Sequence, residues 1–584
     1  MCGIAGALGA GNEGLARAMV EAVRHRGPDG RAEWMSGPVQ LAVARLAIVD
    51  LDAPAAPIAN ESGTIRLAFN GEIYNHRELR VRLEARGHRF RTKTDGEVVL
   101  HLYEEHGAAC VSALRGMFAF AVADGNRVLL ARDRLGIKPL YYSHLDAQEL
   151  FLFASEIKAL LRCTELDPRL DLQSLADSIV LGHTVSTRTS IEGIRTLAAG
   201  HTMTIRATPN GLCVSDQIPY FDRRTFREDE MPYDKAEQML DEVLTDAVEC
   251  HLAADVEVGV ALSGGIDSAL LALLADEHAR SPLRTFAVGD YARNPDLLTA
   301  AQVASAMGSE HTTGILTFGD YVEAVPRLVA TEERPSTLVG MPFFLLSEHV
   351  GAAVKTCLCG EGADELFGGY AEYLQRDAKL ASIARRLPVL EQLGIGLSDE
   401  AAEIVESLTS ARAYDEYLES LLDVNLGAPL ERLHLDGVDK NAMAHGVEMR
   451  VPYLDDRVYA LVTSFPLRYR VHAELGIRKY ILRRLFLRRF DGRHVDVVLR
   501  EKLGAPSSGV QLVMRFDELC DEVLPGDYRE RHELGFCFPT KRQLFAFELF
   551  EDIFLKGRGE PAVVGDVVAY MQERASASVA GVAA

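Results

Sequence analysis

The hydrophobic pattern of the first 220 residues predicts many short strands with a few helices between them. Continuous or alternating apolar segments bounded by Gly, Asn or Asp are typical of strands. They occupy 39–49, 64–69, 116–123, 127–132 and 150–154. Apolar residues recur at helical spacing over 12–23, 76–85 and 97–106. This mixture predicts an α/β fold in which sheets and helices form separate layers.

A different pattern follows the polar, charged stretch at 220–234, which has no periodicity and is expected to link two domains, 1–220 and 221–584. A helix over 235–253 precedes an apolar strand at 256–262, a glycine turn and a helix over 268–278. Further strands are expected at 284–288 and 354–359. Strands that alternate with helices predict a doubly wound parallel sheet. Residues 371–584 are mostly helical in pattern.

The composition is typical of a globular protein, with 48% hydrophobic and 25% charged residues. At roughly 100–200 residues per domain, 584 residues predict two to four domains. The net charge of −23 argues against a nucleic acid or an anionic membrane as partner, because both attract basic surfaces. No apolar run approaches the ~18 residues that span a bilayer, and the N-terminus lacks the basic start of a signal peptide. We therefore expect a cytoplasmic protein.

The nine cysteines are sparse and form no pair of CxxC motifs, which argues against a structural zinc site and favours reduced thiols. Cys2 stands apart because it directly follows the initiator Met. Removal of Met1 would leave a thiol and an α-amine on one residue. An amine with a pKa of about 7.7–8.0 can take the proton of its own nucleophile. Position alone nevertheless favours the plainer interpretation, a small buried residue in an edge strand.

Several motifs that follow in order along the chain instead favour Cys2 as a nucleophile. They are His25–Asp29 (HRGPD), Arg45–Asp50 (RLAIVD), Phe69–Asn75 (FNGEIYN), Thr94–Glu97 (TDGE), Asp133–Leu140 (DRLGIKPL) and Ala154–Lys158 (ASEIK). With the MCGIAG start, these motifs span roughly 160 residues. In their identity and order, this part of the chain resembles the glutaminase domain of class II glutamine amidotransferases. This resemblance implies the αββα sandwich of the N-terminal nucleophile (Ntn) hydrolases for residues 1–220.

Glutamine hydrolysis needs a nucleophile, an oxyanion hole and a clamp for an amino acid. Cys2 Sγ would attack the side-chain amide, while the Asn70 side chain and the Gly71 N–H would hold the oxyanion. The other residues expected to bind glutamine are Arg45, for the α-carboxylate, Glu72 and Asp95, for the α-ammonium, and Ile48 and Val49. The plainer alternatives are a hairpin turn at Asn70-Gly71 and surface charges at Arg45 and Asp95.

A second motif, SGGIDS, joins an apolar strand to a helix. Backbone N–H groups of such a turn can cradle a pyrophosphate, and glycines let the backbone approach it closely. The residues expected to bind ATP here are Leu262, Ser263, Gly264, Gly265, Asp267 and Ser268. Asp267 is also expected to bind Mg²⁺. The motif resembles the loop of enzymes that split ATP into AMP and pyrophosphate. No GxxxxGK[ST] motif occurs, so a Walker-type NTPase is not favoured. The plainer alternative for SGGIDS is a tight strand–helix turn.

A third motif, CGEGADELFGG, follows the strand expected at 354–359 and places carboxylates at the C-terminal edge of the parallel sheet. We expect Cys359 and Gly360 to contact ATP and Asp364 to complete the Mg²⁺ site with Asp267. Glu361 is expected to act as general acid/base at an acyl-adenylate. A solvated, acidic turn is the alternative.

With both halves present, the chain resembles glutamine-hydrolysing asparagine synthetases over nearly its whole length. Further matches lie at Phe286–Gly289, Asn294–Leu297, Met443–Asp455 and Pro539–Lys541. The resemblance implies an ATP-pyrophosphatase domain of the adenine nucleotide α-hydrolase type, with ATP and Mg²⁺ as cofactors and the cytoplasmic chain acting as a homodimer. It implies that ammonia from glutamine crosses a tunnel and displaces AMP from an acyl-AMP. Val288, Lys479 and Lys502 are implied at the nucleotide; Arg450 either joins them or only pairs with Glu448.

The sequence also departs from the family. Cys359 and Ala363 stand where asparagine synthetases usually have Ser, and the stretch 336–344 (STLVGMPFF) is unusually apolar. The acceptor is therefore either aspartate or another small carboxylate, bulkier or less polar, as in specialised metabolism. Lys-Leu-Gly at 502–504 is similar to ring-forming β-lactam synthetases. The intact Cys2 set argues against a vestigial glutaminase of that type, and the pair Asp267 and Asp364 argues against a regulatory module without catalysis.

Overall fold

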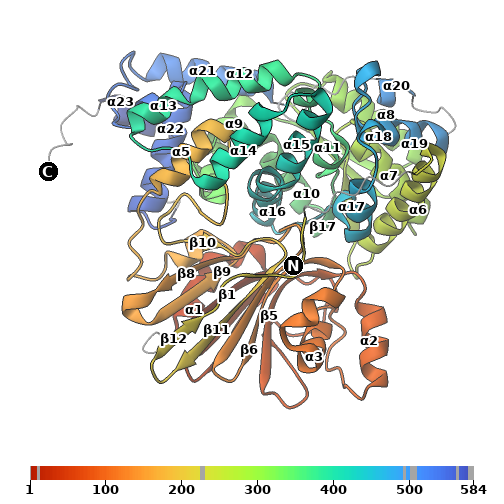
Figure 1. Cartoon of the computed structure of the whole chain (residues 1–584), viewed down its shortest axis with the longest axis vertical. Coiled ribbons are helices and arrows are strands. Elements are labelled where there is room, and N and C mark those ends of the chain that lie inside the picture. Colours follow the sequence, from red (N-terminus) through yellow and green to blue (C-terminus); the bar gives the residue numbers. More distant parts are fainter. Residues whose placement is uncertain are drawn as a thin grey trace.

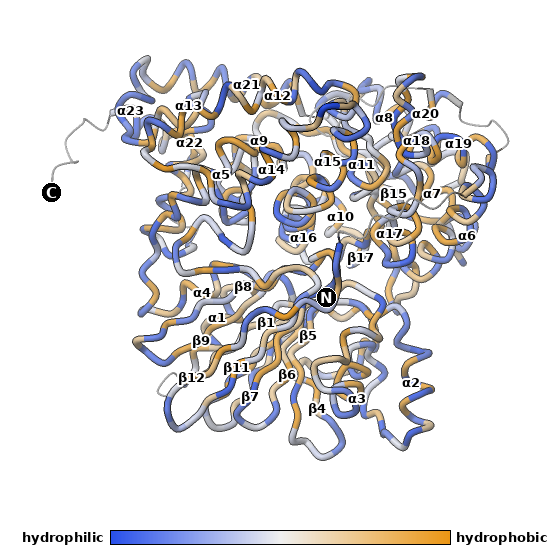
Figure 2. The backbone as a smooth tube through the Cα atoms, viewed as in Figure 1, coloured by the Kyte–Doolittle hydropathy of each residue, from blue (hydrophilic) through white to orange (hydrophobic). Residues whose placement is uncertain are grey.

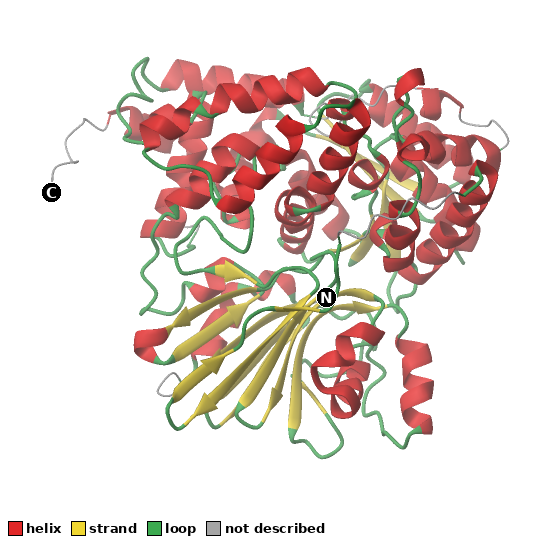
Figure 3. Ribbon diagram, viewed as in Figure 1, coloured by secondary structure: helices red, strands yellow, loops and turns green. Residues whose placement is uncertain are grey.

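The computed structural model describes residues 2–9, 13–223, 231–490, 495–499, 509–560 and 565–576. Figure 1 shows two halves, strand-rich below and mainly helical above, with the N-terminus between them. Figure 3 shows the same division by secondary structure. None of the described helices is both long and apolar enough to cross a membrane.

Two antiparallel sheets form the lower half. The first has the order β10-β8-β9-β1-β3-β2 and the second β12-β11-β7-β6-β5-β4, with β13 paired to β11. The strands of the first sheet are β1 Cys2–Leu8, β2 Gly30–Ser36, β3 Val39–Arg45, β8 Tyr141–Leu145, β9 Leu150–Ala154 and β10 Arg195–Thr196. Those of the second are β4 Ile58–Ala59, β5 Ile65–Ile73, β6 Gly116–Asp124, β7 Arg127–Arg132, β11 His201–Thr208, β12 Gly211–Val214 and β13 Ile218–Pro219.

The side-chain alternation along these strands builds four layers. On β6, Phe118 and Phe120 pack with the outer helices, whereas Ala119 and Ala121 pack between the sheets. Small residues at the sheet interface let the sheets approach closely. Helices α1 (Leu15–Ala22) and α4 (Ile157–Leu160) cover the first sheet, and α2 (His76–Ala85) and α3 (Glu97–His106) cover the second. This arrangement confirms the predicted αββα sandwich. Figure 2 shows α2 with alternating hydrophilic and hydrophobic positions, as expected at a rim.

The upper half contains a parallel sheet of order β16-β15-β14-β17-β18. Its strands are β14 Val258–Ala261, β15 Arg284–Gly289, β16 Glu310–Ile315, β17 Thr356–Leu358 and β18 Glu448–Arg450. The sheet grows outward from β14 in both directions, which confirms the predicted doubly wound topology and creates a switch point between β14 and β17. The sequence pattern missed β16 and β18. β16 is a polar edge strand, and β18 is short and buries charged residues, so neither has a hydrophobic period.

Helices surround this sheet and make up most of the C-terminal part, as predicted. They are α5 Leu172–Leu181, α6 Tyr233–His251, α7 Ile266–His278, α8 Pro295–Met307, α9 Phe318–Glu332, α10 Met341–Gly351, α11 Ala363–Phe367, α12 Arg376–Arg386, α13 Pro388–Leu393, α14 Asp399–Ser410, α15 Tyr414–Leu426, α16 Asp436–Met443, α17 Asp456–Thr463, α18 Leu467–Arg470, α19 Tyr480–Arg489, α20 Val495–Leu499, α21 Val510–Val523, α22 Lys541–Phe550 and α23 Val567–Ser576. Two π-helical segments are η5 Leu430–Leu435 and η10 Glu551–Lys556. Short 3₁₀ helices are η1 Arg24–Arg26, η2 Gly107–Ala113, η3 Asp146–Gln148, η4 Ala371–Tyr373, η6 Pro452–Leu454, η7 Ala473–Leu475 and η9 Gly535–Cys537.

The first 220 residues are not confined to the lower half. Helix α5 lies among the green and blue helices of the upper half in Figure 1. Its Ala176 and Val180 share an apolar cluster with Leu390 and Leu421. The interdomain boundary expected at 220 therefore separates two sheet systems, while one helix from before it packs on the other side.

Buried ion pairs join the two halves. Arg26 is fully buried and donates to Glu156 (2.9 Å) and to Asp439 on α16 (2.7 Å). Lys138, also buried, donates to the other oxygen of Asp439 (3.1 Å). Burial alone would raise the pKa of Glu156, but the neighbouring His25, Lys158 and Arg26 hold that pKa well below its ordinary value. These charges are tolerated in the interior because each one is paired.

Asp439→Ala should destabilise the protein by about 3–5 kcal/mol, because it strips the buried Arg26 and Lys138 of a shared carboxylate. The measurement is the midpoint of urea unfolding, followed by circular dichroism. Glu33→Ala is the matched control, since Glu33 pairs with the exposed Arg17 and should leave the midpoint nearly unchanged. Equal midpoints for the two variants would contradict a structural role for this pair.

Candidate functional site

Cys2 lies at the start of β1, at the edge where the two antiparallel sheets meet. In the β1–β3 register it pairs with Arg45, and its backbone N–H donates to Asn70 Oδ1 on β5 of the other sheet (3.2 Å). The Cys2 side chain is half-buried. The structure therefore brings together Cys2 from one sheet and the Asn70 amide from the other; their predicted catalytic roles stay predictions.

The Asn70 side chain is fully buried, and its Nδ2 has no hydrogen-bond partner among the residues that the structure describes. A buried amide donor without an acceptor costs about 1–3 kcal/mol, so its retention points to a ligand oxygen at this place. The neighbouring Gly71 packs so tightly on β6 that an added Cβ would lie 2.2 Å from Met117 O. Only glycine keeps β5 in register there, and Asn70 thereby keeps its direction.

Two buried carboxylates, Glu72 and Asp95, lie near this amide. Burial raises the pKa of both carboxyl groups above their ordinary values. Asp95 Oδ2 accepts the Ile73 N–H (2.8 Å), whereas Glu72 Oε2 accepts from Arg450 Nη2 of the upper half (2.9 Å). Glu72 therefore also joins the two halves. The predicted contact of either carboxylate with an ammonium stays a prediction.

Arg45 organises the loop that follows β3. Its guanidinium donates to the carbonyl oxygens of Val49 (3.2 Å), Asp50 (2.6 Å) and Ala53 (2.5 Å). Ile48 of this loop is buried beside Met443 of the upper half, and Val49 packs on the same cluster. These contacts fix the loop next to Cys2. The predicted contact of Arg45 with a carboxylate stays a prediction.

A cavity of about 730 Å³ opens at the carboxyl ends of β14, β15 and β17, at the switch point of the parallel sheet. The residues predicted at the nucleotide that line it are Ser263, Gly264, Gly265, Asp267, Ser268, Val288, Cys359, Gly360 and Lys479. Another, Leu262, is buried behind the turn and donates its N–H to Phe286 O (2.8 Å). Gly264 has φ 72° and would place a Cβ 2.2 Å from Asp296 O, so this turn requires glycine.

Asp267 and Asp364 converge on one cation within this cavity. Lys479 Nζ lies 2.6 Å from Asp267 Oδ2 and 2.5 Å from Asp364 Oδ1. Both carboxylates are hard oxygen donors of the kind that Mg²⁺ takes, and the predicted Mg²⁺ site at this pair stays a prediction. Lys479 itself has φ 52°, a left-handed conformation that is strained for a residue with a side chain. Such strain is often found at functional sites.

The sequence analysis missed a group around Glu361. His434 Nδ1 lies 2.9 Å from Glu361 Oε1, and His434 Nε2 lies 3.4 Å from Glu365 Oε1. Burial raises the pKa of Glu365 to about 7, although His434 opposes this shift. Burial alone would lower the pKa of His434, but Glu365 and Glu361 outweigh it and raise that pKa to about 9. His434 lies on the π-helical η5, and no motif marked it.

Two basic residues predicted at the nucleotide, Lys502 and Arg450, are not among the described residues that line the cavity. Lys502 lies outside the described residues. Arg450 is fully buried and donates to Glu448 (2.5 Å), to Glu72 (2.9 Å) and to the carbonyls of His251 and Ala253. The structure therefore supports the alternative in which Arg450 pairs with Glu448, and adds that it links the halves. A guanidinium enclosed by acceptors in this way is not directed at a phosphate.

Comparisons with known proteins match both halves of the chain. A family described as "Glutamine amidotransferase domain" matches residues 1–213, and one described as "Asparagine synthase" matches residues 239–554. Asparagine synthetase [glutamine-hydrolyzing] 1 of Bacillus subtilis is 30% identical over 87% of each chain. Asparagine synthetase [glutamine-hydrolyzing] 3 of the same organism is 30% identical over 80% of each chain.

A search of solved structures lists the glutamine phosphoribosylpyrophosphate amidotransferase from B. subtilis complexed with ADP and GMP. It is 17% identical and covers 54% of this chain and 66% of its own, with a TM-score of 0.28. A score this low adds nothing to the fold described above.

Asn70→Ala should lower kcat for glutamine hydrolysis about 10²–10³-fold, because it removes the buried donor that faces the expected oxyanion. The measurement is steady-state glutamate release. Asn425→Ala is a matched control, a buried Asn on α15 of the upper half whose loss should leave kcat for glutamine hydrolysis unchanged. Equal kcat for the wild type and Asn70→Ala would exclude Asn70 from the oxyanion hole.

Proposed function

The chain belongs to the family of glutamine-hydrolysing asparagine synthetases, an ATP-dependent family of carbon–nitrogen ligases, and from this premise we propose how its two sites divide the reaction. Glutamine is hydrolysed at Cys2, and the ammonia amidates an acyl-adenylate in the upper cavity. The observation that carries the first step is the buried Asn70 amide, which contacts the Cys2 backbone while its own N–H donor stays unpaired among the described residues.

In the first step, the α-amine of Cys2 takes the thiol proton after Met1 has been removed, because its ordinary pKa of about 7.7–8.0 suits a base near neutral pH. The thiolate attacks the side-chain amide of glutamine, and Asn70 Nδ2–H and the Gly71 N–H stabilise the oxyanion. The proton then passes to the leaving ammonia, and water hydrolyses the thioester to glutamate. Asp95 and Glu72 attract the α-ammonium, and Arg45, Ile48 and Val49 position the rest of the substrate.

In the second step, the N–H groups of the Ser263–Ser268 turn and the start of α7 bind the phosphates of ATP. The acceptor carboxylate attacks the α-phosphate, and pyrophosphate leaves. Lys479 stays beside the phosphates, and Lys502 is proposed to stabilise the same charge. Bound at Asp267 and Asp364, Mg²⁺ would neutralise the pyrophosphate. Ammonia then attacks the acyl carbon, Glu361 takes its surplus proton and AMP leaves.

The geometry around Glu361 suits this last role. His434 lies 2.9 Å from Glu361, and its pKa of about 9 keeps it a cation at neutral pH. An imidazolium at this distance orients the Glu361 carboxyl group, which in the proposed step accepts a proton from the attacking ammonia. We therefore add His434 to the proposed site as a positioning residue.

The residues that line the upper cavity bear on which carboxylate it accepts. The lining of the upper cavity includes Val339, Pro342, Phe343 and Leu346, which lie on α10 or just before it. Arg334 adds a cation to the lining. This lining favours a small carboxylic acid with an apolar part over aspartate, although asparagine formation is retained as the alternative.

Cys2→Ala should abolish glutamate release from glutamine and leave amide formation from ammonium salts intact, since only the first site loses its nucleophile. The assay follows glutamate, AMP and pyrophosphate with glutamine or with ammonium chloride as nitrogen source. Cys213→Ala, which replaces an exposed cysteine, is the control and should keep both activities. Glutaminase activity in the Cys2→Ala protein would contradict the assignment of the nucleophile.

A panel of carboxylic acids should separate the two acceptor proposals. We expect ATP/pyrophosphate exchange with small acids that carry an apolar substituent to exceed exchange with aspartate. The variant Phe343→Ala should reduce exchange with the apolar acids at least tenfold and leave exchange with aspartate less affected. Strong exchange with aspartate alone would identify the chain as an asparagine-forming enzyme and reject the apolar acceptor.

A further inference from the structure

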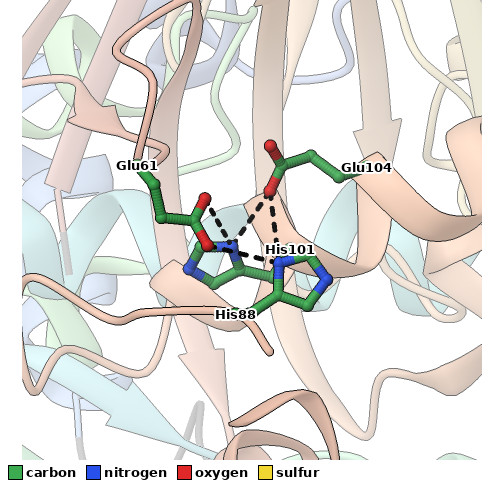
Figure 4. A group of neighbouring side chains, drawn as sticks. All are labelled: Glu61, His88, His101 and Glu104. Atoms are coloured by element: carbon green, nitrogen blue, oxygen red, sulfur yellow. Dashed lines mark hydrogen bonds and ion pairs between the residues drawn. The ribbon is translucent and has the colours of Figure 1, made fainter. Parts of the chain in front are cut away.

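Four side chains from three separate segments converge at the outer side of the second sheet, away from both proposed sites. Glu61 lies in the turn between β4 and β5, His88 in the loop after α2, and His101 and Glu104 on α3. Figure 4 shows both imidazole rings facing the two carboxylates. One ligand atom from each of the four lies within 4.8 Å of the other three.

The spacing of these atoms is that of a coordination sphere. The Nδ1 of His101 lies 3.0 Å from Glu104 Oε2 and 3.5 Å from Glu61 Oε2. The Nδ1 of His88 lies 3.4 Å from Glu61 Oε1 and 3.6 Å from Glu104 Oε2. Three of these four distances are long for hydrogen bonds. Bonds of about 2.0–2.1 Å to a tetrahedral ion place neighbouring ligand atoms about 3.3–3.4 Å apart.

The far nitrogen of each ring also has a carboxylate beside it. His88 Nε2 lies 3.3 Å from Glu105 Oε1, and His101 Nε2 lies 3.7 Å from Glu97 Oε1. These distances exceed those of ordinary hydrogen bonds, but each carboxylate adds negative charge behind its ring, which favours an imidazole that binds a metal through Nδ1. The ligand carboxylates are held as well, since Glu104 Oε1 accepts from Asn60 Nδ2 (2.7 Å) and Glu61 Oε1 accepts the Arg89 N–H (2.9 Å).

We propose that Glu61, His88, His101 and Glu104 bind one Zn²⁺. Two imidazole nitrogens and two carboxylate oxygens are ligands that zinc accepts, and four protein ligands in a tetrahedron give a closed, structural site. The expectation from the sequence that no structural zinc is present rested on cysteine spacing alone, and this site uses no cysteine. The buried side chain of His101 makes the site part of the fold.

The proposed zinc site lies at the loop from His88 to Glu97, so that a bound metal would hold this loop in place. Glu97, the carboxylate behind His101, accepts the N–H groups of Arg91 (2.6 Å) and Thr92 (2.7 Å). The loop from His88 to Glu97 is thus held at both ends, and it carries Asp95. Zinc would tie this loop to α3 and to the β4–β5 turn, and thereby stabilise the segment that presents Asp95 to the glutaminase site.

The test is zinc binding by the whole chain after removal of metals with EDTA. We expect the wild type to retain one more equivalent of Zn²⁺ than His88→Ala, measured by mass spectrometry of the metal after gel filtration. His106→Ala, which replaces an exposed histidine at the end of α3, is the control and should retain the wild-type amount. Because thiols and the upper cavity can also bind zinc, the difference between variants is the quantity that decides.

Two further readouts complete the test. Zn²⁺ should raise the melting temperature of the wild type and of His106→Ala, but not of His88→Ala. If His88→Ala does not fold by circular dichroism, Glu105→Gln replaces it, and removal of this outer carboxylate should weaken zinc binding about 10–100-fold. Equal zinc content and equal stabilisation in the wild type and the variants would overturn the proposal and leave an ion-pair cluster without metal.

Discussion

The architecture depends on a carboxylate, Asp439, that is shared by two buried cations. Arg26 and Lys138 come from the lower half, Asp439 comes from α16 of the upper half, and all three side chains are nearly inaccessible to solvent. Charges of this kind are stable only when the partners arrive together, because an unpaired buried ion costs several kcal/mol. The two halves therefore cannot shift independently without exposing a charge to an apolar interior.

This shared carboxylate also lies between the two proposed sites. Arg26 Nε donates to the backbone oxygen of Cys2 (3.4 Å), while Asn441, two residues after Asp439 on α16, lines the upper cavity. Arg450 repeats the arrangement, since it holds Glu72 beside the glutaminase site and Glu448 on β18. The interface is thus built from the residues that position both sites, and a fixed relation between the sites follows from the same ion pairs that stabilise the fold.

The overall charge of −23 has little bearing on this chemistry. Each site is governed by local groups: buried carboxylates near Cys2, and Lys479 between two aspartates above. A net charge of −23 argues against a nucleic acid or an anionic membrane as partner, whereas the proposed phosphate-binding turn would work through backbone N–H groups and need few cations. The proposed zinc site is likewise governed by local groups, since its ligands come from segments that carry no recognisable motif.

How far the sequence predicts the structure depends on how local each feature is. The strand at β7, the helices α2 and α3, and the strand–turn–helix of Ser263–Ser268 were predicted within a few residues, because their hydrophobic period and glycines are local. The polar edge strand β16 was missed, since exposure removes the hydrophobic period. His434 was missed because it is 73 residues from Glu361 and its role arises only from their contact.

The sequence by itself determined the two-part α/β architecture and the family, through motifs whose residues are close together along the chain. Only the tertiary structure decided which partners the charged residues take. Arg450 turned out to bind carboxylates across the interface, and Glu61, His88, His101 and Glu104 turned out to share one place. The physical reason is that a local pattern encodes burial and backbone geometry, whereas the pairing of distant charges is set by folding, which brings them within a few ångströms.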